Sequence, residues 1–79
     1  MDSAKLNCCR PGDIIVTPIP GGFMLGRMLP ERLSSGLWWE YIRVLTEEST
    51  ALQEARRLAA MTKAHAWLSR GADEYTPIT

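Results

Sequence analysis

The fold is decided by the stretch DIIVTPIPGGFMLGRML, residues 13–29. Its first part, Asp13 to Ile19, is rich in β-branched residues and too short for a helix, so it predicts a strand. The prolines at 18 and 20 restrict this strand to a sheet edge or mark its end. Gly21-Gly22 supplies the positive φ that a hairpin turn needs. We therefore predict that Phe23 to Leu29 returns as a second, antiparallel strand.

A third strand is predicted at Leu37 to Leu45, where the sequence LWWEYIRVL combines aromatic and β-branched side chains. Pro30 ends the second strand, and residues 31–36 form the loop that leads into the third. Three consecutive strands joined by short loops are typical of an antiparallel meander.

One amphipathic helix is predicted after the strands, over Ala51 to Lys63, because strong helix formers dominate there. Thr50, with Gln53 three residues later, fits a capping box, which marks the start of a helix. Apolar residues recur along one stripe of this segment and polar residues occupy the remainder. We therefore expect the helix to pack on one face of the sheet.

Two alternatives stay open for residues 64–70. The helix can continue, since no helix breaker occurs before Gly71, or Ala66 to Arg70 can form a fourth short strand. We favour the strand, because a helix over residues 50–70 would overhang strands of about five to eight residues. The predicted fold class is α+β: a three-stranded antiparallel meander, one helix packed on one sheet face and a short strand, in the order β-β-β-α-β.

Length and charge limit the organisation of the chain. Seventy-nine residues suffice for one hydrophobic core, and we expect a flexible lead-in at 1–12, one domain at 13–71 and a C-terminal tail at 72–79. Nine Lys and Arg balance nine Asp and Glu, so no global field attracts nucleic acid or anionic lipid. No run of about 20 apolar residues and no secretory signal occur, so we expect a cytoplasmic protein without a membrane partner.

Alternation along the predicted strands produces two largely apolar faces, of which one helix can cover only one. We expect the row Met24, Gly26 and Met28 to face the helix, because Gly26 would let the helix alanines approach closely. The opposite face then carries a candidate interaction surface of aromatic, aliphatic and Arg side chains: Phe23, Leu25, Arg27, Trp39, Tyr41 and Arg43.

These residue types are enriched at protein interfaces. We therefore predict a non-enzymatic binding or assembly module that forms a homodimer through this apolar face or a sheet edge. The alternative is that the N-terminal segment or the tail folds over the face and completes an ordinary core.

A second hypothesis is a module that binds single-stranded nucleic acid, with bases stacked on Trp39 and Tyr41 between Arg27 and Arg43. The formal net charge of zero removes the usual electrostatic attraction. We therefore rank this hypothesis below self-association.

Catalysis is not indicated by the sequence. No spacing of a nucleophile and a base, no phosphate-binding glycine loop and no set of metal ligands occurs, so we predict no catalytic, cofactor-binding or metal residues. His65 is the only histidine, and Cys8 and Cys9 are adjacent, a spacing that suits neither a structural disulfide nor a zinc site. Glu40 is the one carboxylate among apolar strand residues, and a salt bridge or exposure at an edge explains it as well as catalysis does.

The order of elements, with GGFML at 21–25 and EARRLA at 54–59, resembles that of small uncharacterised bacterial β-β-β-α-β proteins. The resemblance covers residues 13–70 and implies the fold alone, because it carries no catalytic residues. This chain differs in its longer second connection and in having no glycine between the helix and the last strand. A small SH3-like barrel around residues 11–16 is a second possibility, to which the helix would be an unusual addition.

Overall fold

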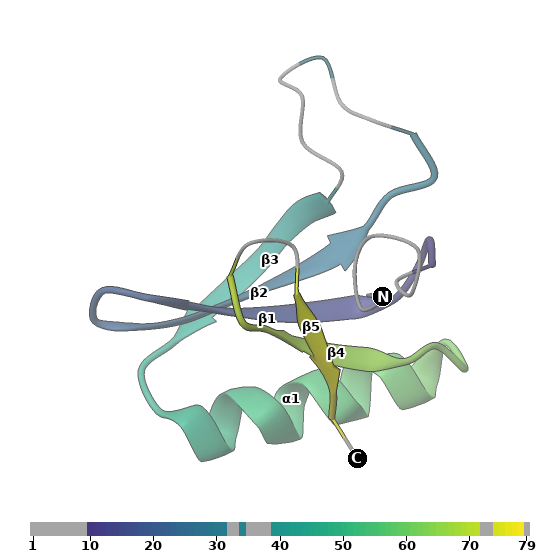
Figure 1. Ribbon diagram of the computed structural model, residues 1–79. Coiled ribbons are helices and arrows are strands. Elements are labelled where there is room, and N and C mark those ends of the chain that lie inside the picture. The colour runs from purple at the N-terminus through teal and green to yellow at the C-terminus, as the bar shows by residue number, and fades with distance from the viewer. Residues whose placement is uncertain (1–9, 32–33, 35–38, 72–73, 79) are drawn as a thin grey trace.

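A computed structural model describes residues 10–31, 34, 39–71 and 74–78, which form one five-stranded sheet and one helix (Figure 1). The strand order in the sheet is β3-β2-β1-β4-β5. The elements are β1 (Ile14–Ile19), β2 (Gly22–Met28), β3 (Trp39–Leu45), α1 (Glu48–Met61), β4 (Ala66–Ser69) and β5 (Tyr75–Pro77).

The α+β class and the β-β-β-α-β order are confirmed. β1, β2 and β3 pair antiparallel as a meander. β4 is the predicted fourth strand, and it pairs parallel with β1, so the meander edge at β1 is covered. The sequence analysis placed residues 75–77 in the tail, whereas the structure pairs them with β4 as β5.

Turn geometry explains where the first hairpin closes. Ile19 pairs with Gly22, so Pro20 and Gly21 form a two-residue loop. Gly21 has a φ of 85°, a conformation that other residues seldom adopt. The predicted role of glycine in this turn is therefore confirmed for Gly21.

The helix begins earlier than predicted. Its N-cap is Glu47, whose side chain makes no capping hydrogen bond, and Thr50 already lies inside α1, so the predicted capping box is wrong. The acidic Glu48 in the first turn suits the positive end of the helix dipole. At the other end, Lys63 adopts a φ of 56°, and the Ala64 amide donates to the carbonyl of Ala59. This turn ends the helix and directs the chain into β4.

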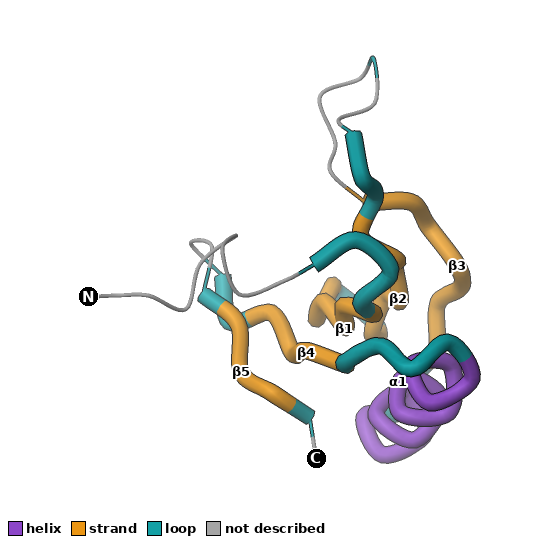
Figure 2. Tube along the Cα trace, turned by 90° about the vertical axis from the view of Figure 1, so that its right-hand side faces the viewer, coloured by secondary structure: helices purple, strands orange, loops and turns teal. Residues whose placement is uncertain are grey.

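Small side chains let α1 lie close to the sheet. Ala51, Ala55 and Ala59 are buried on the helix surface that faces the strands. They pack against Ile14, Val16, Leu25 and Ala66, with Phe23, Ile42, Leu45 and Leu68 among the partly buried side chains around them. Figure 2 shows α1 lying along one side of the curved sheet. We call this side the helix face.

The prediction that Met24, Gly26 and Met28 face the helix is wrong. Leu25 belongs to the core beneath α1 and is 0% exposed, whereas Met28 belongs to a separate cluster with Ile15. The space left by Gly26 is filled from within the sheet, because a Cβ there would lie 2.6 Å from Cε3 of Trp39. Gly26 therefore accommodates an aromatic ring and not the helix.

Candidate interaction face

The sheet surface opposite α1 is the candidate functional site, and we call it the second face. Strand pairing defines its members, because paired residues project to the same side. Ile15 pairs with Gly26 and with Trp67, and Met28 pairs with Trp39. The described side chains on the second face are Ile15, Thr17, Ile19, Met24, Met28, Trp39, Tyr41, Val44, Trp67, Ser69, Tyr75 and Pro77.

A bulge in β3 decides which of its side chains reach this face. Leu25 pairs with Arg43 and Gly26 pairs with Tyr41, so Ile42 is an extra residue without an opposite partner. Ile42 packs against the core under α1. The bulge interrupts strict alternation and places Val44 on the same side as Tyr41.

The candidate residues predicted from the sequence divide between the two faces. Trp39 and Tyr41 lie on the second face, as predicted. The other predicted members lie on the helix face: Phe23 and Leu25 in the core, Arg27 and Arg43 in ion pairs. The predicted surface is therefore not one contiguous patch.

Most residues of the second face were missed by the predicted surface, among them Met24, Val44, Trp67 and Tyr75. Trp67 had a usable signal, since it alternates with Ala66 and Leu68 in the predicted fourth strand. Val44 had none, because its side depends on the bulge. Tyr75 belongs to the tail, and its ring packs on this face as the alternative of a tail folded over it anticipated, although its strand is only three residues long.

The second face has a buried centre and an exposed margin. Ile15 and Met28 are buried beneath the partly buried rings of Trp39, Trp67 and Tyr75. Toward the β3 edge, Tyr41 is 62% exposed and Val44 is 44% exposed. An aromatic and an aliphatic side chain thus meet solvent beside one another on a face that is otherwise closed by rings.

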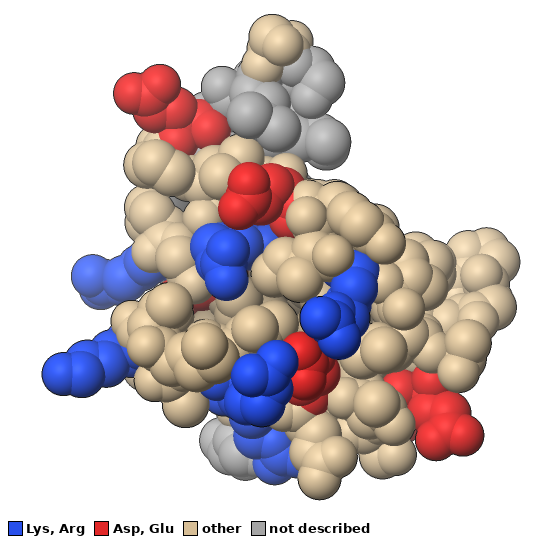
Figure 3. Space-filling view, turned by 180° about the vertical axis from the view of Figure 1, so that it is seen from behind, with Lys and Arg blue, Asp and Glu red and all other residues tan. Residues whose placement is uncertain are grey.

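The second face of the described strands carries no charged side chain. The charged strand residues are Arg27, Glu40 and Arg43, and all three lie on the helix face. Arg27 pairs with Glu40 at 3.6 Å, and Arg43 pairs with Glu54 of α1 at 3.7 Å. Seen from behind, basic and acidic side chains lie next to one another (Figure 3). Charge is therefore balanced locally and kept away from the second face.

Asp13 anchors one ring of this face. Its side chain is buried, and its two carboxylate oxygens accept three hydrogen bonds, from the Trp67 Nε1 at 2.9 Å and from the backbone amides of Arg10 at 3.0 Å and His65 at 3.1 Å. These hydrogen bonds offset the loss of hydration that burial of the side chain costs. The sequence analysis treated Asp13 only as the start of a strand and missed this role.

The residues considered for catalysis lie apart from one another. Glu40 has a side chain 50% exposed and is paired with Arg27, and His65 is exposed. Within the described ranges, no three His, Cys, Asp or Glu side chains come together in a way that could hold a metal ion. Cys8 and Cys9 lie outside the described residues. No helix in the described part of the chain is both long and apolar enough to cross a membrane.

No protein-family model matches this chain, and no curated protein or solved structure shows significant similarity to it. The resemblance to small bacterial β-β-β-α-β proteins therefore stays a prediction. The function is therefore inferred from the geometry of the chain itself.

Proposed function

We propose that this protein is a small non-enzymatic assembly module that pairs with a second copy of itself through the second face. The observation that carries the proposal is the pair Tyr41 and Val44, exposed by 62% and 44% beside the partly buried Trp39 on an uncharged sheet surface. Contiguous apolar side chains that meet solvent usually mark an interaction site.

The face is favoured over the β3 edge as the contact. β3 is a terminal strand of the sheet, so its outer backbone groups lack a neighbouring strand among the residues that the structure describes. However, the bulge at Ile42 and the charged side chains of Glu40 and Arg43 are devices that discourage pairing at an edge. The apolar side chains on the second face meet no such obstacle.

A second copy of the chain suits this face better than a charged partner does. Two uncharged faces related by a two-fold axis meet without repulsion between like charges. The molecule measures 28 × 26 × 25 Å between Cα atoms, so one face offers on the order of the 800 Å² that each partner buries in a standard interface. Tyr and Trp are also frequent anchors of such interfaces.

The arginines that nucleic-acid binding would require do not lie on the second face. The hypothesis required Arg27 and Arg43 to lie between Trp39 and Tyr41, whereas both arginines lie on the helix face in ion pairs. Stacking of bases without contacts to phosphate yields little affinity. We therefore do not propose nucleic-acid binding as the function. The cytoplasm is the compartment expected from the sequence.

Light scattering on a size-exclusion column tests the proposal across a dilution series. We expect the wild-type chain to have twice the mass of one 8.9 kDa chain at high concentration. Val44→Glu should shift the protein to the monomer, because it would bury an unpaired charge in the interface.

Met61→Glu is the matched control. Met61 is an equally apolar side chain, 69% exposed, but it lies on α1. This variant should keep the dimer. A monomeric wild-type protein at every concentration, or a Val44→Glu variant that still dimerises, would contradict the proposal.

A further inference from the structure

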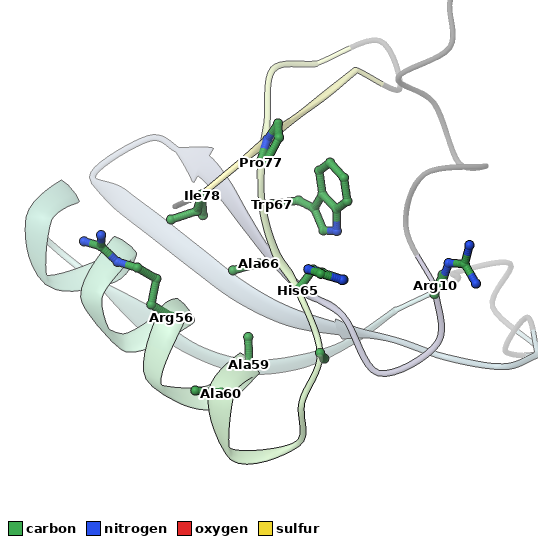
Figure 4. Close-up of a pocket in the computed structure, with 10 residues that line it drawn as sticks. Arg10, Arg56, Ala59, Ala60, His65, Ala66, Trp67, Pro77 and Ile78 are labelled. Carbon is green, nitrogen blue, oxygen red and sulfur yellow. The ribbon is translucent and has the colours of Figure 1, made fainter.

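A hollow of about 430 Å³ lies where the last turns of α1 meet β4 and the end of β5 (Figure 4). Alanines form much of its lining: Ala59 and Ala60 from α1, Ala64 from the connection and Ala66 from β4. Their small side chains leave space between helix and strand that longer ones would fill. The hollow is thus a consequence of the alanines that let α1 approach the sheet.

One wall of the hollow is aromatic and fixed in position. Trp67 lines it together with Pro77. The indole cannot turn freely, because its Nε1 donates to the buried carboxylate of Asp13 at 2.9 Å. Trp67 projects to the opposite side of β4 from Ala66, so its ring and the alanines line the hollow from two sides, and a flat apolar molecule would fit between them.

The remaining polar lining is basic. Arg10 and Arg56 lie at opposite ends of the hollow, with His65 between them (Figure 4). None of the described lining residues is acidic. A smaller adjoining hollow shares Arg10 and His65 and adds Lys63. Its Asp13 carboxylate is buried and accepts hydrogen bonds from Arg10, His65 and Trp67, so the exposed charged side chains that line the two hollows are the cations Arg10, Arg56 and Lys63.

We propose that this hollow binds a small aromatic carboxylate. The flat ring would lie against Trp67 and the alanines, and the carboxylate would meet the guanidinium of Arg10, whose fork of donors matches a carboxylate. The hollow shares Trp67 and Pro77 with the second face, but the exposed residues Tyr41 and Val44, on which the proposal of self-association depends, do not line it.

Benzoate is the probe, and its uncharged isostere benzamide is the chemical control. In a titration of the full chain followed by 1H,15N NMR, benzoate should produce saturable shifts of the Trp67 indole N–H and of the Ala66 amide. Benzamide should bind distinctly more weakly. Equal binding of the two compounds, or linear shifts without saturation, would overturn the proposal.

Arg10→Gln tests the contact with the anion. Arg10 is bonded to Asp13 through its backbone amide and its backbone carbonyl, so this variant keeps that anchor. We expect benzoate to bind about fivefold more weakly, the effect of losing one exposed ion pair. Arg57→Gln is the matched control, because Arg57 is an exposed arginine of α1 that does not line the hollow. An equal loss in both variants would show attraction by overall charge only and would overturn the proposed site.

Ala60→Phe tests the space itself. Ala60 is exposed and lines the hollow, so a larger side chain can fill it without entering the core. This variant should fold normally and lose benzoate binding, and unchanged binding would place the ligand elsewhere. Val44→Glu should bind benzoate like the wild type, so a failure of this site is distinguishable from a failure of dimerisation.

Discussion

The two faces of the sheet are closed by different means. On the helix face, α1 covers Ile14, Val16 and Leu25 so completely that each is 0% exposed. On the second face, rings from the strands themselves cover Ile15 and Met28. Aromatic rings on three strands can shield a narrow centre but cannot reach its margin, where Tyr41 and Val44 are exposed. The single helix therefore covers one face of the five-stranded sheet, and the other face is closed only by side chains of the strands.

The distribution of charge follows the same division. Arg27 and Arg43 lie on the helix face, close enough to Glu40 and Glu54 to form ion pairs with them. The second face of the described strands lacks such groups. The helix face therefore combines a buried apolar core with charged side chains at its periphery, whereas the strands of the second face offer apolar contacts without charged groups.

The largest expected effect distinguishes the two faces by stability. Leu25→Ala should lower the free energy of unfolding by about 2–5 kcal/mol, because it leaves a cavity in a fully buried core. Val44→Ala should change it by only about 0.5 kcal/mol in the monomer, because the side chain is exposed. Urea unfolding followed by tryptophan fluorescence at low protein concentration measures both. Equal losses in the two variants would remove the distinction between the faces.

A smaller effect is expected at the anchor that joins the turn before β1 to the second face. Asp13→Ala removes the acceptor for the Arg10 amide, the His65 amide and the Trp67 indole. We expect a loss of about 1–3 kcal/mol, the cost of buried donors without a partner. Asp13→Asn keeps one carbonyl acceptor and should lose less. If the two substitutions were equal in thermal and urea unfolding, the hydrogen bonds would not be the cause.

The smallest effect concerns the charged margin of the helix face. The hydrogen bond from Arg57 to Glu54, helped by the charges of Arg57 and Arg43, holds the pKa of the Glu54 carboxyl below its ordinary value. A lowered pKa in the folded state stabilises the protein above the ordinary pKa of 4.5, and this contribution is lost as the pH falls through the folded-state pKa. Glu54→Gln should therefore be slightly less stable than the wild type at pH 7.

The stability difference between Glu54→Gln and the wild type should shrink as the pH falls below about 4.5. Urea midpoints of the two proteins at pH 7, 4 and 3 measure it. Gln53→Glu, a change at an exposed neighbour on α1, is the control for adding or removing charge on the helix. A constant difference across this range would show that the ion pair does not contribute.

Local signals in the sequence sufficed for most of the elements. β-Branched and aromatic runs located β1 and β3, the hairpin signal at Gly21-Gly22 located β2, and helix formers located α1. Tertiary structure decided between helix and strand for residues 64–70, because residues 66–69 form a strand only where β1 offers a parallel partner. β5 is stabilised in the same way by β4.

Periodicity correctly separated Phe23, Leu25 and Arg27 from Met24, Gly26 and Met28, because alternation within a strand is a local property. The sequence by itself therefore determined the α+β class, the meander and the presence of two apolar faces. Only the tertiary structure decided which face α1 covers, the bulge at Ile42 that brings Val44 beside Tyr41, and the contact of Asp13 with Trp67. Each of these depends on contacts between residues distant in the chain, whose energies no local pattern records.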